Sequence, residues 1–175
     1  QHPAHCYNSP TGEIMATAEG GWDNYSFSIN NTDWVTVEVN QNAHVFNNLL
    51  ANEHQVWVRD GNNCTVSQIT EVTQPAELVI DNVTTTPITC YGGSNGSLTV
   101  YASGGNGGYQ YSIGDGFIES NMFSGLAAGV YTVSIRDSLG CSNSVDVTIN
   151  QPLNFTLEVV TNSYNGYNIG CYGQT

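Results

Sequence analysis

The chain has 175 residues and a net charge of −13, because fifteen Asp and Glu residues face only two Arg and no Lys. A surface this acidic excludes nucleic acid, whose phosphates bind basic patches, and no stretch has the ~20 apolar residues that a membrane helix needs. Only 10% of the residues are charged, and Asn, Thr, Ser and Gly supply most of the polarity, as is common in secreted β proteins.

Apolar and polar residues alternate with a period of two along the whole chain, and helical spacing is nowhere sustained. In chain order, the alternation predicts strands at 14–18, 25–29, 56–58, near 69–73, and at 77–86, 98–102, 109–113, 131–135, 145–149 and 153–160. Glycine-rich turns separate them, because glycine readily adopts the positive φ of tight turns. Short strands with one buried face predict an all-β chain of tandem Ig-like (PKD-like) β-sandwich domains in an extended array.

The sequence repeats itself, and the repeat decides the expected architecture. Residues 6–29 match 90–113 at an offset of 84, and residues 46–64 match 123–141 at an offset of 77. Seven extra residues therefore lie inside the earlier of the two copies.

The repeat predicts three domains. We expect a repeat domain at 1–75 (the first copy), another at 76–152 (the second copy), and the start of a third at 153–175. The chain begins and ends at the same phase of the repeat, as a window from a longer array would. We therefore expect the first strand of domain 1–75 to be missing or to lie outside this sequence.

The second copy carries a distinctive series of motifs. They are CYGGSNG at 90–96, YQYSI at 109–113, FSGLAAGVYTV at 123–133, RDSLGC at 136–141 and QP at 151–152. This series resembles the SprB repeat, which occurs in very large Bacteroidetes cell-surface adhesins, including the gliding-motility adhesin. The resemblance implies export by type IX secretion, an extracellular location at the cell surface, and a role in adhesion or gliding.

These observations predict a non-enzymatic stalk or display segment of a large secreted adhesin or filament, because the chain has no G-x-S-x-G motif or phosphate loop. Two alternatives remain open: a carbohydrate-binding module that uses exposed tryptophans, and a spacer attached to an exported enzyme. We expect neighbouring repeats as partners, with surface glycans or the substratum as further candidates. We expect no catalytic site, metal site or cofactor; calcium is left open, although no D-x-D-x-D-G loop is present.

Each copy has one cysteine near its start and one before its last strand. In an exported β protein this pattern favours one disulfide per domain, so we predict Cys6 with Cys64 and Cys90 with Cys141. A bond between Cys64 and Cys90 would recur at the same phase and is the alternative. Cys171 would be the first cysteine of the third copy.

Three further residues are candidates for contact or modification. Trp57 and Trp34 could stack on sugars, because aromatic faces do so, and both belong to the first copy. Ser138, in the sequence Asp-Ser-Leu, resembles the Bacteroidetes O-glycosylation signal.

An Arg-Asp pair recurs at 59–60 and 136–137, at the end of the penultimate strand of each copy. We expect the Asp to cap the hairpin turn and the Arg to pair with a neighbouring carboxylate.

Overall fold

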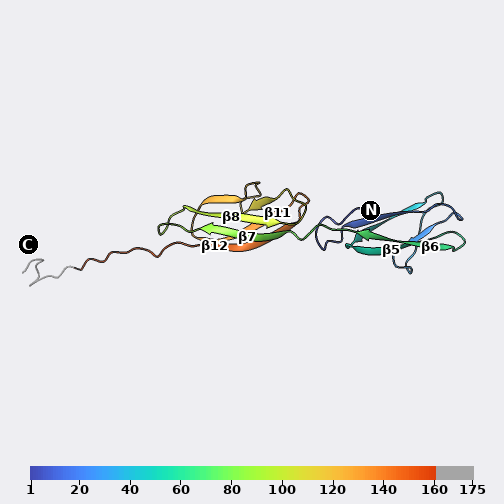
Figure 1. Ribbon diagram of the computed structural model, residues 1–175, viewed down its shortest axis with the longest axis horizontal. Helices are drawn as coiled ribbons and strands as arrows, with labels where there is room; N and C mark the ends of the chain where they lie inside the picture. Colours follow the sequence, from blue (N-terminus) through green and yellow to red (C-terminus); the bar gives the residue numbers. More distant parts are fainter. Residues whose placement is uncertain (161–175) are drawn as a thin grey trace, which may run out of the picture.

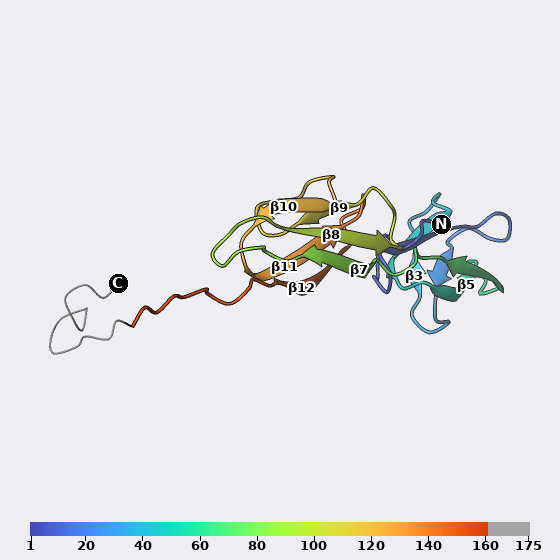
Figure 2. The same ribbon diagram turned by 60° about the vertical axis from the view of Figure 1, so that its left-hand side comes forward.

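A computed structural model describes residues 1–160. The described chain is all-β, as the sequence predicts, and forms two β-sandwiches that lie in line (Figure 1). The view turned by 60° shows the same arrangement (Figure 2). Most of the predicted third copy, Cys171 included, lies outside the described residues.

The first copy contains six strands in two sheets. They are β1 (Gly12–Thr17), β2 (Ser26–Ser28), β3 (Val35–Thr36), β4 (Ala43–Leu49), β5 (Asn52–Arg59) and β6 (Thr65–Val72). One sheet consists of β1 and β4, and the other has the order β3-β2-β5-β6. The extra residues of this copy form β3 and the approach to β4.

The second copy also has six strands: five match strands of the first copy, one is additional at its start, and β3 has no counterpart. Its strands are β7 (Val79–Thr86), β8 (Gly96–Ser103), β9 (Gln110–Ser112), β10 (Met122–Leu126), β11 (Gly129–Arg136) and β12 (Ser142–Ile149). The sheets have the orders β10-β8-β7 and β12-β11-β9. β8 matches β1 and β10 matches β4, so β7 is the strand that the first copy lacks.

The core of the second copy is continuous and draws on both sheets. It contains Leu78, Ile88, Leu98, Val100, Tyr111, Leu126, Val133, Ile135 and Ile149. The large side chains buried in the first copy are fewer: Ile14, Phe27 and Val72. Burial of apolar area stabilises each sandwich by about 25 cal/mol per Å², so the first copy gains less from its core.

The strand expected at 153–160 is the one expectation about strands that was wrong in the described chain. These residues form no strand and are exposed throughout. An extended segment needs a neighbouring strand for its backbone hydrogen bonds, and the tail runs away from both sandwiches (Figure 1).

Candidate functional site at the junction of the two copies

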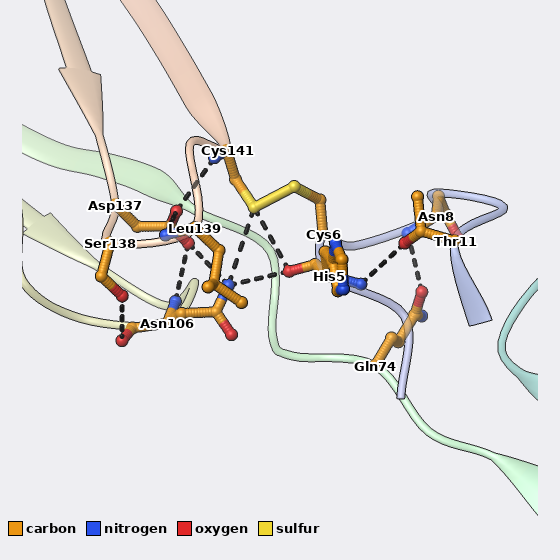
Figure 3. Close-up of a disulfide and its surroundings, with 10 residues drawn as sticks. All are labelled: His5, Cys6, Asn8, Thr11, Gln74, Asn106, Asp137, Ser138, Leu139 and Cys141. Carbon is orange, nitrogen blue, oxygen red and sulfur yellow. Dashed lines mark hydrogen bonds between the residues drawn. A yellow bond between two sulfur atoms is a disulfide. The ribbon is translucent and has the colours of Figure 1, made fainter. Parts of the chain in front are cut away.

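A disulfide joins the two copies. Cys6, in the loop before β1, is bonded to Cys141, in the hairpin turn between β11 and β12, with a Cα–Cα distance of 5.7 Å (Figure 3). The two residues are 135 positions apart in the sequence. The bond therefore links the first cysteine of one copy to the second cysteine of the next.

The predicted pairs, Cys6 with Cys64 and Cys90 with Cys141, were wrong in this structure, as was the alternative Cys64 with Cys90. Cys64 and Cys90 are free and exposed. The two cysteines of one copy lie at opposite ends of its sandwich. Cys6 precedes β1, which begins at Gly12, and Gly12 pairs with Leu49 at one end of the sandwich. Cys64 lies in the turn between β5 and β6, at the other end of these eight-residue strands. The two ends are therefore separated by a strand length of about 25 Å.

Asn106 joins the two copies beside the disulfide. Its side-chain amide donates to the backbone oxygen of His5 in the first copy and to Asp137 Oδ2 in the second, both at 2.8 Å. The same nitrogen lies 3.6 Å from Cys141 Sγ (Figure 3). The junction thus combines a covalent bond with a polar contact.

Asp137 holds the turn that presents Cys141. It is only 4% exposed, and its Oδ1 accepts hydrogen bonds from the backbone N–H of Leu139 and of Cys141. Burial raises the pKa of Asp137, but the hydrogen bonds from the backbone and side chain of Asn106 and from the turn outweigh it and hold the pKa below its usual value. The predicted turn cap is confirmed.

The first copy forms the same turn around Asp60. The backbone N–H groups of Asn62 and Cys64 donate to Oδ1, and that of Trp22 donates to Oδ2. The hydrogen bond from Trp22, then that from Cys64, lowers the pKa of Asp60. Trp22 stands where the second copy has Asn106, and its ring is 67% exposed.

The expected pairing of each Arg with a carboxylate was wrong. Arg59 lies over the ring of Trp34 at 4.5 Å, and Arg136 lies over the ring of Phe117 at 4.3 Å. Arg136 also donates from Nε to Gln110 Oε1. Both guanidinium groups make cation–π contacts, each worth about 0.5–1 kcal/mol at exposed sites.

Both glycan candidates are partly covered. Trp57 is half-buried on β5, where it pairs with Ser28 and Ser67. Trp34 is half-buried and has Arg59 against one face of its ring. Glycan binding through these two residues stays a prediction.

Ser138 is exposed at the junction, and its hydroxyl donates to the backbone oxygen of Asn106. Its O-glycosylation also stays a prediction. Across residues 1–160, no three His, Cys, Asp or Glu side chains are grouped as metal ligands. In the same residues, no helix has the length and apolar character needed to cross a membrane.

The fold and the junction define a class: tandem β-sandwich repeats joined by a covalent bond between successive copies. The family model of the SprB repeat matches residues 1–33 and 82–116, that is, the beginning of each copy. The predicted resemblance to the SprB repeat family is confirmed in these two regions. Comparison with curated proteins finds no match.

Comparison with solved structures finds similarity to bacterial and animal proteins. A C-terminal fragment of intimin, in complex with the intimin-binding domain of its translocated receptor, is 18% identical with a TM-score of 0.40; the alignment covers 81% of this chain and 52% of that one. The amphioxus IgVJ-C2 molecule is 12% identical with a TM-score of 0.34, and the alignment covers 83% of this chain and 99% of that one. Fibronectin(III)-like modules of Clostridium thermocellum CbhA are 11% identical with a TM-score of 0.31, and the alignment covers 86% of this chain and 91% of that one. The chain spans about half of the intimin fragment.

Proposed function

We propose that this chain is a non-enzymatic repeat segment of a large secreted cell-surface adhesin or filament, in which it acts as a stalk. The match to the SprB repeat supports a surface repeat module. The observation that carries the proposal is the disulfide between Cys6 and Cys141, because it ties one repeat to the next. Type IX secretion, gliding and a Bacteroidetes source rest on the resemblance alone.

The disulfide changes how a pulling force passes through the chain. Force applied at the two ends reaches Cys6, crosses the bond to Cys141, and bypasses the 135-residue interval between them. Fully extended, that interval would add about 450 Å to the chain at ~3.3 Å per residue. A stalk with this bond therefore keeps its length under load even when a sandwich unfolds.

The disulfide also fits an exported protein. Disulfides persist in oxidising compartments and are rare in the cytosol. Cys6 and Cys141 are only half-buried, so the bond would be accessible to cytosolic reductants. We therefore propose that the protein works outside the cell, where its partners are neighbouring repeats and the surface that it displays or touches.

Single-molecule force spectroscopy tests the proposal. The chain would be held by handles at its two ends, with Cys64→Ser and Cys90→Ser present to remove the free thiols. Under oxidising conditions, we expect that pulling releases none of the interval from Cys6 to Cys141. After reduction, or with Cys6→Ser and Cys141→Ser as the matched variant, we expect about 450 Å more extension. Equal extension in both states would overturn the proposed mechanical role.

A further inference from the structure

Hydrogen bonds that do not involve sulfur hold the turn that carries Cys141. The carboxylate of Asp137 accepts the backbone N–H of Cys141 at Oδ1 (2.9 Å) and the backbone N–H of Asn106 at Oδ2 (2.8 Å). The backbone N–H of Ser138 donates to Gly107 O at 2.9 Å. The turn that carries Cys141 is therefore tied to the loop that carries Asn106.

The loop that carries Cys6 is tied to the linker between the two copies. The backbone N–H of Ala4 donates to Thr73 O at 2.8 Å. The backbone N–H of Asn8 donates to Gln74 Oε1 at 2.7 Å (Figure 3). One of these contacts lies before Cys6 and the other after it, so together they fix the position of this cysteine relative to the linker.

The second copy has the same two contacts at its own first cysteine. The backbone N–H of Ile88 donates to Asn150 O at 2.9 Å, and that of Gly92 donates to Gln151 Oε1 at 2.8 Å. These residues match those of the first copy at the repeat offsets of 84 and 77. The contact of Gln151 holds the loop of Cys90, so it repeats the chemistry of the first copy at a place away from the disulfide.

The side chain of Asn106 connects the two held segments. Its amide nitrogen donates to the backbone oxygen of His5 and to Asp137 Oδ2, both at 2.8 Å (Figure 3). His5 directly precedes Cys6, and Asp137 holds the turn of Cys141. Asn106 therefore brings the two bonded cysteines together by a polar contact from one copy to the other.

None of these contacts needs the S–S bond, so the same contacts can form between the reduced segments. The Cα atoms of Cys6 and Cys141 are 5.7 Å apart, within the range that a disulfide requires. The equilibrium constant of an intramolecular bond rises with the effective concentration of one reacting group at the other. Contacts that restrict the motion of both segments raise this effective concentration.

We propose that Asn106 and Gln74 are positioning residues for the oxidation that links the two copies. They hold the thiols of Cys141 and Cys6 beside each other before the bond forms, and they stabilise the bond against reduction afterwards. This inference rests on the disulfide of the proposed function, but it does not depend on the mechanical role of that bond.

The oxidation needs a disulfide oxidant, for which glutathione disulfide is used in the test. The thiolate of one cysteine attacks the oxidant, forms a mixed disulfide and releases one glutathione. The thiolate of the other cysteine attacks the mixed disulfide, forms the bond between Cys6 and Cys141 and releases the second glutathione. The two cysteines lose two electrons and two protons, which the two glutathione thiols gain. Positioning acts on the second step, because that step is intramolecular.

Equilibration of the full chain in glutathione redox buffers tests Asn106. Cys64→Ser, Cys90→Ser and Cys171→Ser would be present, and thiol labelling with mass spectrometry would measure the oxidised fraction. We expect Asn106→Ala to lower the equilibrium constant of bond formation about tenfold, which raises the reduction potential by about 30 mV. The control Ser138→Ala removes a hydrogen bond to Asn106 O within the second copy, and it should leave the constant nearly unchanged.

Asn106→Asp gives a signature that a general loosening of the loop would not give. It replaces the amide donor by a carboxylate next to that of Asp137, and like charges repel. We expect a larger loss than in Asn106→Ala at low salt. Part of the excess should disappear at 1 M salt, where the Debye length falls to about 3 Å, whereas the loss in Asn106→Ala should not depend on salt.

The pair Gln74→Ala and Gln151→Ala tests the loop of Cys6. Both changes remove the same kind of contact with a backbone N–H, but only Gln74→Ala releases the loop that carries Cys6. Since one hydrogen bond contributes a modest net free energy, we expect Gln74→Ala to lower the equilibrium constant about threefold. Gln151→Ala should leave it unchanged.

Three results would overturn the proposal. They are an unchanged equilibrium constant in Asn106→Ala, equal salt dependence in Asn106→Ala and Asn106→Asp, and equal effects of Gln74→Ala and Gln151→Ala. The force measurement tests the stalk separately, because it compares the oxidised and reduced chain without regard to how readily the bond forms. Failure of one proposal is therefore distinguishable from failure of the other.

Discussion

In the second copy, β7 covers the edge of β8 and closes the core, whereas the matched edge of β1 in the first copy has no such strand in the described chain. The loops of the two copies nevertheless agree. The tyrosine hydroxyl of Tyr25 donates to Gly20 O, and that of Tyr109 donates to Gly104 O. Loop shape is thus set by local hydrogen bonds and glycine conformation, while core closure depends on a strand from beyond the loop.

The largest contrast should come from alanine at the matched glycines. In Gly104→Ala, the positive φ alone should lower the free energy of unfolding by about 1–2 kcal/mol. The new Cβ also contacts Glu77 O and forces β7 to shift, which brings the total loss to about 3 kcal/mol. In Gly20→Ala, the φ is the same but the new Cβ meets no atom, so the free energy of unfolding should fall by about 1 kcal/mol. Equal costs would mean that β7 does not pass Gly104 as described.

Urea unfolding can measure the two copies separately in one chain. All three tryptophans lie in the first copy, so tryptophan fluorescence follows that copy alone. Far-UV circular dichroism follows both copies, and the second transition is obtained by difference. Reducing conditions remove the disulfide that would couple the two transitions.

A smaller contrast is expected at the matched valines Val133 and Val56. Val133→Ala removes a fully buried side chain and should cost about 2.5 kcal/mol in the free energy of unfolding. Val56→Ala affects a half-buried side chain and should cost about 1 kcal/mol or less. Equal changes in the free energy of unfolding for the two variants would contradict this difference in burial.

The smallest contrast concerns the turn carboxylates. Asp137→Asn puts an amide donor against the donors of Asn106 and should cost about 1.5 kcal/mol at pH 7. Asp60→Asn should lower the free energy of unfolding by less, because within residues 1–160 Asp60 Oδ2 accepts a hydrogen bond only from the N–H of Trp22.

The pH dependence of that effect follows from the direction of the pKa. The pKa of Asp137 is lowered in the folded state, so its stabilisation is fully present above the unfolded pKa of about 4 and is lost as the pH falls through the folded pKa. The difference between wild type and Asp137→Asn should be constant from about pH 5 to 8 and shrink below about pH 4. A difference that does not shrink at all as the pH falls below about 4 would contradict this role.

The sequence predicted what depends on local pattern. Alternation located most of the strands but missed β3, β4 and β10, and an Asp at the start of a tight turn predicted the caps at Asp60 and Asp137. The partners of Arg59 and Arg136 were missed, because the rings beneath them belong to segments 25 and 19 residues away, and only the packed sandwich brings them together.

The disulfide was missed for a similar reason. The two cysteines recur at the same positions of each copy, so every copy should use them in the same way. A bond within each copy meets this condition, but so does a bond from Cys6 to the second cysteine of the next copy. The choice depends on which end of the sandwich each cysteine occupies, and strand register decides that. The repeat offset itself was the signal that could have suggested this third pairing.

Peptide mapping under non-reducing conditions tests the central claim most directly. The oxidised chain would be digested with free thiols blocked, and disulfide-linked peptides identified by mass spectrometry. The structure predicts a peptide pair joining Cys6 to Cys141, with Cys64 and Cys90 blocked in the monomer. Linked peptides joining Cys6 to Cys64 and Cys90 to Cys141 would contradict the account of a covalent junction between successive copies.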